Sequence, residues 1–289
     1  MAKEQKKKKT LKILIIAKQN KAGIRAAKRI EKKLEEFTKD IEFDLSTALQ
    51  LREHGTPISR FDGDLVITVG GDGTFLWAAH KTKKPILPVK IEGYGFLCTT
   101  TEKELLENIP NLVKGNYKII ERMRLACSKI AHGHVESYLY RILHKNYPLS
   151  LNEITFARKR PSKILRVEVK IDDTVFNCTG DGVMFATPSG STGYNASSGG
   201  SLIDHSLDAI SMTTLYPFFS KMKPIIIPAN KRIEIFVKGG ECALVIDGHG
   251  GDYIKSSTTF VIEKSEPAKI ITFKDYNFYE KINKELIET

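Results

Sequence analysis

The sequence has no long hydrophobic run, although 41% of its 289 residues are hydrophobic. No segment approaches the roughly 18 consecutive apolar residues that a membrane-spanning helix needs. The lysines at positions 6–9 are followed by neither a long apolar region nor a cleavage site of the kind that ends a signal peptide. We therefore expect a soluble, cytoplasmic protein with no membrane partner.

Cysteine is scarce as well. The chain has four, and none of them forms a Cys-x-x-Cys pair. This spacing gives no support to a zinc ribbon or to redox chemistry, so we expect buried thiols. His132 and His134 form a His-x-His pair, but no further ligand stands at the usual spacing, and a hairpin tip is the favoured interpretation. We expect no dedicated metal site.

The chain has fewer acidic than basic residues, 34 against 45, which gives a net charge of +11. Such a charge suits a nucleic-acid binder or an enzyme whose substrates are polyanions, and composition does not separate the two. Part of the excess lies in a lysine-rich tail over residues 1–10, and runs of this kind are usually solvated and disordered. We expect the tail to be inert for the main activity, and we expect no nucleic-acid partner.

Several familiar catalytic motifs are absent. The chain contains no G-x-x-x-x-G-K-[ST] P-loop, and its Gly-Asp-Gly sequence at residues 71–73 lacks the third glycine of the dinucleotide-binding fingerprint. There is no G-x-S-x-G nucleophile elbow and no H-E-x-x-H zinc motif. P-loop enzymes and hydrolases of these classes therefore lose support.

Residues 11–118 alternate between short apolar runs and segments with helical periodicity. Apolar residues recur every three or four positions from Ala22 to Phe37, which predicts an amphipathic helix. Alternation of this kind is typical of an α/β domain with a parallel sheet, whose ligands lie beyond the carboxyl ends of the strands. Four strands are expected besides: Leu11–Ala17, a short one marked by Phe43 and Leu45, one that ends at Gly70, and Pro85–Ile91. Two more helices are expected, at Thr74–His80 and Glu102–Leu112.

Residues 119–265 hold many runs rich in β-branched residues, separated by turn signals, with almost no helical period. We expect a β-rich second domain, and the spacing alone leaves a sandwich and a barrel open. Residues 266–289 predict a strand and then a helix, Tyr279–Ile287, that return to the first domain. The strands expected in the second domain are Leu125–Ala131, Val135–Leu143, Leu151–Ala157, Leu165–Ile171, Val183–Ala186, Pro224–Ile227, Arg232–Val237, Cys242–Ile246 and Thr259–Ile262.

The stretch from Val66 to His80 predicts a strand, a glycine turn and a helix. Glycines let a ligand approach the backbone, and the N–H groups at the start of a helix attract an anion. The candidates for phosphate binding are Gly70, Gly71, Gly73 and Thr74. Each dipeptide is also an ordinary turn signal, so the stretch by itself gives a phosphate site and a plain tight turn similar weight.

A second polar segment, Thr179–Ile203, crowds hydroxyl groups and an amide between glycines directly after an apolar run. Pro188 and Tyr194 interrupt the Gly/Ser pattern of a flexible linker, so we favour a loop that binds a small molecule. Asn152 and Glu153 are adjacent in an expected strand, and by themselves they are a weak signal. His249 lies in a predicted turn between strands.

Taken together, these motifs resemble the ordered motifs of the NAD kinase family. They are Gly70-Gly71-Asp72-Gly73-Thr74, Asn152-Glu153, Asp181-Gly182 and the loop from Thr187-Pro188-Ser189 to Tyr194. The first motif alone is shared with diacylglycerol and sphingosine kinases and, in a related form, with 6-phosphofructokinases. The long hydroxyl-rich loop, the upstream Asn-Glu pair and the order of the motifs separate this chain from those enzymes. The resemblance runs from about residue 11 to about residue 271.

The resemblance implies transfer of the terminal phosphate of ATP, another nucleoside triphosphate or polyphosphate to the adenosine ribose 2′-hydroxyl of NAD, which gives NADP. It also implies a β-sandwich as the second domain, Mg²⁺ carried with ATP, and a homodimer or homotetramer with sites near the subunit interface. Asp72 would accept the proton. The NAD-binding residues would be Asp72, Gly73, Asn152, Glu153, Lys163, Asp181, Ser189, Thr192, Gly193, Tyr194, Asn195, Ser197 and His249.

The chain departs from the family pattern at Lys90 and Glu92, where relatives usually have Asn and Gly. These replacements imply a changed site lining. The nearest rival interpretation is a lipid or sugar kinase that shares only the glycine turn. A rival of another class is a regulator that binds NAD(P) without turnover, or a nucleic-acid binder that uses the basic tail.

Overall fold

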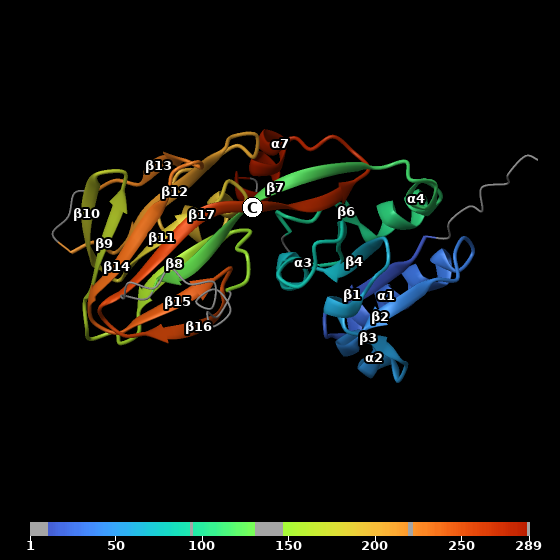
Figure 1. Cartoon of the computed structure of the whole chain (residues 1–289). Coiled ribbons are helices and arrows are strands. Elements are labelled where there is room, and N and C mark those ends of the chain that lie inside the picture. Colours follow the sequence, from blue (N-terminus) through green and yellow to red (C-terminus); the bar gives the residue numbers. More distant parts are fainter. Residues whose placement is uncertain (1–10, 93–94, 131–146, 219–221, 288–289) are drawn as a thin grey trace, which may run out of the picture. The chain divides into compact units, whose positions relative to one another are not determined.

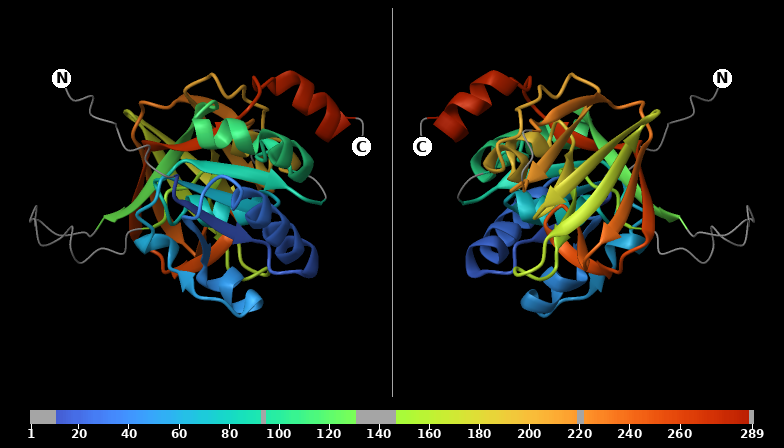
Figure 2. Two further views of the ribbon diagram at one scale, coloured as in Figure 1. Left: turned by 90° about the vertical axis from the view of Figure 1, so that its right-hand side faces the viewer. Right: turned by 90° about the vertical axis from the view of Figure 1, so that its left-hand side faces the viewer.

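The computed structural model describes residues 11–92, 95–130, 147–218 and 222–287 (Figures 1 and 2). The chain divides into two units: unit 1 comprises residues 1–121 and 269–289, and unit 2 comprises residues 122–268. Unit 1 is an α/β unit and unit 2 is formed by antiparallel sheets, which confirms the expected fold class. The expected strand Val135–Leu143 and the pair His132 and His134 lie outside the described residues.

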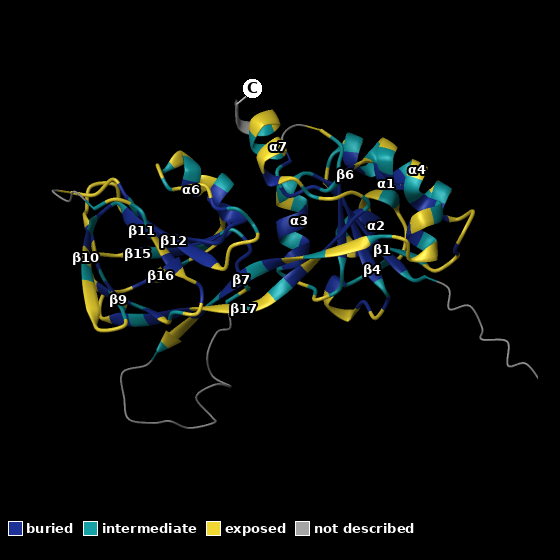
Figure 3. Cartoon of the chain, turned by 90° about the horizontal axis from the view of Figure 1, so that it is seen from above, coloured by how far each residue is buried: buried dark blue, intermediate teal, exposed yellow. Residues whose placement is uncertain are grey.

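Unit 1 is built on a parallel sheet. Its strands are β1 (Ile13–Ala17), β2 (Ile41–Asp44), β3 (Gly55–Thr56), β4 (Leu65–Gly70), β5 (Ile86–Lys90) and β6 (Thr100–Thr101), with the 3-10 turn η1 (Ile58–Arg60) before β4. The strand order is β5-β4-β1-β2-β3, and β6 pairs with β5. Every residue of β1 and β4 is buried, as Figure 3 shows in dark blue, which is typical of a parallel sheet covered on both faces.

Two helices of unit 1 begin at strong caps. The side chain of Asn20 caps α1 (Lys21–Leu34), and Thr101 takes part in a capping box at the start of α4 (Glu102–Lys114). Both helices were expected from the sequence. The first ends before Phe37, whose side chain is 40% exposed and does not extend the buried face of the helix.

The structure contains a helix that the sequence pattern did not predict, α2 (Leu45–Leu51). The Asp44 carboxylate accepts hydrogen bonds from the N–H groups of Ser46 and Thr47, at 3.0 and 3.2 Å. These bonds cap a helix at the point where a strand was expected to continue. Leu45 is therefore the first residue of a helix and is 56% exposed, and its assignment to a strand was wrong.

The helix after the glycine turn, α3 (Asp72–Ala79), begins two residues earlier than the expected start at Thr74. Gly71 is its N-cap in an extended conformation, so Asp72 is the first helical residue and not part of the turn. A carboxylate in the first turn interacts favourably with the positive end of the helix dipole.

Unit 2 consists of two antiparallel sheets. The first contains β10 (Thr174–Gly180), β9 (Leu165–Ile171), β14 (Ile233–Gly239) and β17 (Thr258–Thr272) in that order, and β7 (Lys118–Ile130) pairs with β17. The second contains β13 (Ile225–Pro228), β12 (Ala209–Leu215), β11 (Gly182–Ala186), β8 (Glu153–Arg158), β15 (Cys242–Ile246) and β16 (His249–Ile254). Buried residues of both sheets form one hydrophobic core, in which Phe156 and Phe260 meet edge to face at 5.2 Å. This arrangement is a β-sandwich.

Unit 2 contains three strands that the sequence pattern missed, β10, β12 and β16. β12 buries Ser211 and Thr213 beside its apolar residues, and β16 has two glycines directly after its first residue, so neither strand shows a clean apolar pattern. β8 begins at Glu153, so Asn152 lies just before the strand and not on it. β17 runs unbroken through Pro267 and joins two strands that were expected separately.

The last residues of the chain belong to unit 1. Ile270 of β17 pairs in parallel with Ile86 of β5. After β17 comes α7 (Phe278–Ile282), followed without a gap by a π-helical segment, η3 (Asn283–Ile287). The expected helix Tyr279–Ile287 is therefore present, and it changes from α-helical to π-helical at Asn283 (Figure 2, red). Within the described ranges, no helix has the length and apolar character needed to cross a membrane.

Candidate active site

The glycine turn after β4 leaves open space beside the start of α3. A Cβ on Gly70 would lie 2.4 Å from the hydroxyl oxygen of Thr74, so this position requires glycine. A Cβ on Gly73 would meet no atom of the described residues within 4 Å. The four phosphate-binding candidates, Gly70, Gly71, Gly73 and Thr74, thus lie together at the N-terminus of an eight-residue helix. Such a terminus attracts an anionic group.

Asp72, the candidate proton acceptor, is held by two backbone donors. Its Oδ2 accepts a hydrogen bond from the N–H of Phe96 at 2.8 Å, and its Oδ1 accepts one from the N–H of Leu97 at 2.9 Å. Burial raises the pKa of Asp72, and these two N–H groups and the Lys281 ammonium act against that rise. A carboxylate has about four acceptor positions, so a substrate hydroxyl can donate to it as well.

A second group of candidates is organised by a buried carboxylate in unit 2. The Asp247 carboxylate accepts hydrogen bonds from the Ser150 hydroxyl at 2.6 Å and from the N–H groups of Leu151, Asn152 and Glu153 at 2.8, 2.8 and 3.0 Å. The positive φ angles of Asp247 and Gly248, 49° and 70°, suit a two-residue hairpin turn between β15 and β16. The predicted turn is therefore confirmed, and it also fixes the Asn-Glu pair.

Asn152 has a buried side-chain oxygen without a hydrogen-bond partner among the described residues, and Glu153 has a buried carboxyl with a raised pKa. The Asn152 Oδ1 atom is buried without a hydrogen-bond partner among the described residues. Glu153 is 6% exposed, and burial, followed by the negative charge of Asp247, raises its pKa to about 7. A buried acceptor without a donor costs free energy, so this position favours a ligand that brings a donor.

The hydroxyl-rich loop is in direct contact with the Asn-Glu pair. The Thr187 hydroxyl donates to the carbonyl of Leu151, and the Thr187 N–H donates to the carbonyl of Asn152 at 2.8 Å. A Cβ on Gly190 would lie 2.1 Å from that same carbonyl oxygen, so only glycine allows the close approach. His249 is joined to the group as well, because its Nδ1 lies 2.8 Å from the carbonyl oxygen of Asp247.

The loop folds on itself through the short helices η2 (Gly190–Thr192) and α6 (Tyr194–Ser197). Asn195 is fully buried: its amide donates to the carbonyls of Ser191 and Ser201 at 3.3 and 3.0 Å and accepts from the Thr213 hydroxyl at 2.8 Å. Its side chain therefore holds the loop together. The candidates on the outer edge of the loop are Gly193, Tyr194 and Ser197, with Thr192 half-buried and Ser189 buried.

Two candidates lie away from this group. Asp181 forms an ion pair at 2.9 Å with Arg158, the last residue of β8, whereas Glu153 is the first. At about 3.3 Å per residue, the two ends of this strand lie roughly 16 Å apart. The hollow that Lys163 lines has a volume of about 720 Å³ and is also lined by Arg160, Arg166 and Lys255. Within a single copy of the chain, Lys163 and Asp181 therefore do not lie beside Asn152.

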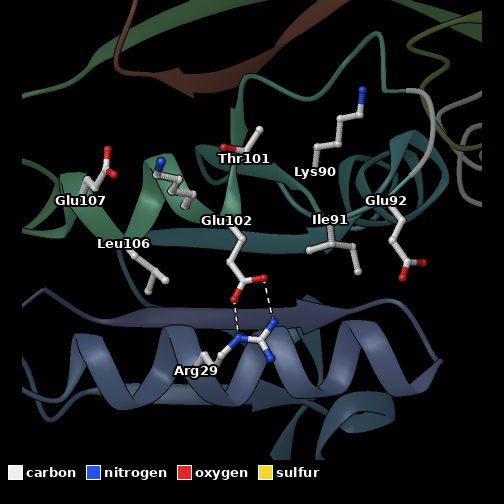
Figure 4. Close-up of a pocket in the computed structure, with 9 residues that line it drawn as sticks. Arg29, Lys90, Ile91, Glu92, Thr101, Glu102, Leu106 and Glu107 are labelled. Atoms are coloured by element: carbon white, nitrogen blue, oxygen red, sulfur yellow. Dashed lines mark hydrogen bonds and ion pairs between the residues drawn. The ribbon is translucent and has the colours of Figure 1, made fainter.

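The residues that depart from the family pattern line a different pocket, of about 840 Å³ (Figure 4). Arg29 and Glu102 form a two-pronged ion pair across it, at 2.6 and 2.8 Å, and Figure 4 shows the Lys90 ammonium pointing away from that pair. Lys90 instead pairs with Glu285 at 3.1 Å. Asp72 is not among the lining residues. The pocket nevertheless adjoins the glycine turn, because the N–H of Ile91, which lines it, donates to the carbonyl of Gly70 at 3.1 Å.

No dedicated metal site was found in the part of the chain that the structure describes, where no three His, Cys, Asp or Glu residues gather in a way that could hold an ion. The four cysteines are buried and free, as the sequence predicted. His132 and His134 lie outside these residues.

Comparison with known proteins decides between the rival interpretations. The family model for the ATP-NAD kinase N-terminal domain matches residues 6–117, and that for the ATP-NAD kinase C-terminal domain matches residues 151–273. An NAD kinase of Thermoplasma acidophilum is 31% identical over 91% of this chain and 94% of its own length. The chain belongs to the NAD kinase family. A further relative, an NAD kinase of Methanothermobacter thermautotrophicus, is 30% identical over 83% of this chain and 82% of its own length.

Solved structures of NAD kinase family members share the fold. A yeast NADH kinase complexed with NADH superposes with a TM-score of 0.85 at 21% identity, covering 97% of this chain and 88% of that one. An NAD kinase from Archaeoglobus fulgidus in complex with ATP gives a TM-score of 0.72 at 23% identity, covering 94% and 99%. The resemblance to the NAD kinase family is confirmed, and the lipid and sugar kinase interpretation, which used the glycine turn alone, loses its support.

Two residues beside the site were missed by reasoning from the sequence. Asp247 was visible only as part of a turn signal, although an Asp-Gly pair after an apolar strand does predict a hairpin. Lys281 gave no signal, since it lies beyond residue 271, where the resemblance to the family ends.

Proposed function

We propose that this NAD kinase family member phosphorylates the adenosine ribose 2′-hydroxyl of NAD with the terminal phosphate of ATP, which yields NADP. The observation that carries the proposal is the position of Asp72, a carboxylate fixed by two N–H groups at the first turn of α3, directly after the open glycine turn. Relatives named NAD kinase support the substrates.

In this mechanism the 2′-hydroxyl attacks the terminal phosphorus of ATP, the bond from that phosphorus to its bridging oxygen breaks, and ADP leaves. Asp72 orients the hydroxyl and takes its proton. An unperturbed aspartate, with a pKa of about 3.9, is a weak base toward an alcohol. Phosphoryl transfer has a loose transition state, however, so positioning and charge stabilisation matter more than early deprotonation. The burial that raises the pKa of Asp72 also makes it a better proton acceptor.

The glycine turn and the N-terminus of α3 would hold phosphate oxygens through N–H groups. We expect Mg²⁺ to arrive with ATP and to neutralise charge on the donor, because Mg²⁺ is commonly held by substrate phosphates and waters with only one or two carboxylates.

In unit 2, NAD would supply the donor that Asn152 Oδ1 lacks, from its adenine amino group or from a hydroxyl. Glu153, Tyr194 and Ser197 would complete the contacts with the nucleoside. Asn195 would contribute by shaping the loop, because its amide is already fully used within the protein.

We further propose a homodimer or homotetramer, in which a second copy supplies Lys163 and Asp181. This is supported by the distance along β8 that separates these residues from Asn152 on one chain. The cytoplasmic location, and the choice among ATP, other nucleoside triphosphates and polyphosphate, stay predictions.

The test is to incubate the protein with NAD, Mg²⁺ and a panel of donors, and to measure NADP with an NADP-specific dehydrogenase. We expect NADP with at least one donor. Digestion of the product by a 2′-nucleotidase should return NAD. The absence of NADP with ATP, other triphosphates and polyphosphate alike would overturn the proposal.

A further inference from the structure

The loop that holds Asp72 is itself held by the C-terminal segment. Phe96 and Leu97 donate to the two Asp72 oxygens, and the carbonyl of the next residue, Cys98, accepts a hydrogen bond from the Lys281 ammonium at 2.7 Å. Lys281 lies on α7, 183 residues further along the chain. The same short loop therefore joins the candidate proton acceptor to a cation from the end of the chain.

The surroundings of Lys281 favour one position of its ammonium. The nitrogen lies 5.6 Å from the ring centroid of Phe96 and 5.5 Å from that of Tyr276. Phe278 of α7 meets the Phe96 ring edge to face, with centroids 6.4 Å apart. Aromatic faces attract a cation and exclude water from it, so the charge is directed at the loop rather than at solvent.

Lys90, one of the two residues that depart from the family pattern, forms a second contact with the C-terminal segment. Lys90 forms an ion pair at 3.1 Å with Glu285 of η3, and both side chains are largely buried, with exposed fractions of 26% and 14%. The Asn that relatives usually have at position 90 carries no charge and could not form an ion pair with Glu285. The replacement at Lys90 therefore has a partner in the same C-terminal segment that carries Lys281.

We propose that Lys281 is a positioning residue of the active site, whose ammonium holds the loop Gly95–Cys98 that binds the Asp72 carboxylate. This rests on the proposed function, because it treats Asp72 as the proton acceptor. Lys281 acts through Asp72 and the loop, and it is not itself assigned a contact with substrate.

Four titratable groups face Asp72 or Lys281 among the described residues: the partner in the pair itself, Cys98, Glu285 and Lys90. Asp72 faces the Lys281 ammonium and the Cys98 thiol, and Lys281 also faces Glu285 and Lys90. Burial lowers the pKa of Lys281, and attraction by the carboxylates of Asp72 and Glu285 opposes that decrease. Loss of the cation would therefore raise the pKa of Asp72 further, and a protonated Asp72 cannot take the proton of the hydroxyl.

The experiment compares neutral and charged replacements in the full chain. In Lys281→Met we expect kcat to fall about tenfold, and the acid limb of kcat to move up by about one pH unit, since an opposite charge nearby usually shifts a carboxyl by 1 to 3 units. Lys281→Gln makes the same change of charge in a polar side chain, so the result does not depend on a single variant folding. Lys281→Arg should restore the wild-type acid limb.

A second measurement needs no turnover. Hydrogen exchange of the Phe96 and Leu97 amides should become about tenfold faster in Lys281→Met, because the carbonyl that anchors their loop loses its donor. The matched control is Lys284→Met, an exposed lysine of η3 two positions beyond α7, for which we expect wild-type exchange and kinetics.

The outcomes separate the two proposals. If the wild-type protein makes no NADP, the proposed function fails, and amide exchange together with ¹³C NMR titration of the Asp72 carboxyl still tests the role of Lys281. If Lys281→Met and Lys281→Gln lower only the melting temperature, with an unshifted acid limb and exchange like that of Lys284→Met, Lys281 is merely a structural anchor and the inference is overturned.

Discussion

In unit 1 the Asp72 carboxylate is held by two backbone N–H groups, whereas in unit 2 the Asp247 carboxylate does the holding, accepting four hydrogen bonds from residues 150–153. The first acid is the group that reacts in our mechanism, and its supports are main-chain N–H groups, which no substitution other than proline removes. The second acid contacts no reacting atom in that mechanism. One substitution there releases the whole Asn-Glu segment.

The two regions also differ in what they leave unsatisfied. Asp72 has partners on both oxygens, but the Asn152 Oδ1 atom is buried with none among the described residues. We conclude that the glycine turn is prepared for chemistry before substrate arrives, while the Asn152 position is completed by its ligand. Substitutions in the first region should therefore lower kcat, and those in the second should affect KM for NAD and stability.

The largest effect is expected for Asp72→Asn. The amide cannot take the proton of the 2′-hydroxyl, so kcat should fall by about 10² or more, the usual range for loss of a general base. Binding of NAD, measured by calorimetry, should change by no more than a few fold. Asp62→Asn is the control, because that side chain is 82% exposed. Full activity of Asp72→Asn would show that Asp72 is structural.

The next largest effect is expected for Asp247→Asn. The asparagine amide keeps one acceptor oxygen, but its NH₂ group, itself a donor, would face backbone N–H groups that now donate to the carboxylate. The free energy of unfolding should therefore fall by about 2–4 kcal/mol, as is usual for broken hydrogen bonds to a charge. The KM for NAD should rise about tenfold as the Asn-Glu segment loosens, with the KM for ATP little changed. Urea denaturation and steady-state kinetics measure the two effects.

Asp173→Asn is the matched control, an exposed aspartate in another turn of unit 2. If Asp247→Asn is as stable as this control, the four hydrogen bonds do not organise the segment.

Glu153 should make stability depend on pH in a direction opposite to that of most carboxylates. Burial raises its pKa from 4.5 to about 7, so the folded protein binds this proton more tightly than the unfolded chain does. The contribution to the free energy of unfolding is therefore present at low pH and is lost as pH rises from about 4.5 to about 7. With 1.36 kcal/mol for each unit, the loss is about 3 kcal/mol.

Glu153→Gln should remove this pH dependence, and urea denaturation at several pH values between 4.5 and 8 measures it. Glu263→Gln, at a side chain that is 52% exposed, provides the baseline. An unchanged slope in Glu153→Gln would place the titrating group elsewhere.

The smallest effect is expected for Asn152→Ala. Loss of one neutral hydrogen bond with NAD is worth about 0.5–1.5 kcal/mol, so the KM for NAD should rise several fold. A misplaced 2′-hydroxyl should also lower kcat, while the KM for ATP stays the same. Asn177→Ala, on the exposed side of β10, should behave like the wild type. A change in the KM for ATP alone would contradict the placement of NAD beside Asn152.

The parts of the site that the sequence predicted are those with local signals. The glycine turn, the Asn-Glu pair and the Thr187–Ser198 loop each lie within a short stretch whose residue types carry the chemistry. The α/β pattern of unit 1 was equally readable, because fully buried parallel strands give apolar runs and amphipathic helices give a period near 3.6. The start of α2 was missed because the sequence there resembles a strand, whereas the Asp44 side chain caps a helix at that point.

The supports of the site could not be predicted, because they join residues far apart in the chain. Asp247 and Ser150 are separated by 97 positions, and Lys281 and Cys98 by 183. A single sequence contains no periodicity or spacing that reports such a contact. The sequence showed that Lys90 departs from the family pattern, but only the structure shows that this lysine forms an ion pair with Glu285.

Unit 2 is one continuous piece of chain, whereas unit 1 is interrupted after residue 121 and resumes at residue 269. During synthesis, the ribosome releases all of unit 2 before it has delivered the strand segment that pairs with β5 or the helix that bears Lys281. Domains generally fold in the order in which they emerge, so the half of the protein that begins first should be finished last. A premature stop codon near residue 268 would leave the glycine turn intact in sequence and yet yield a protein without the cation that we place over Asp72.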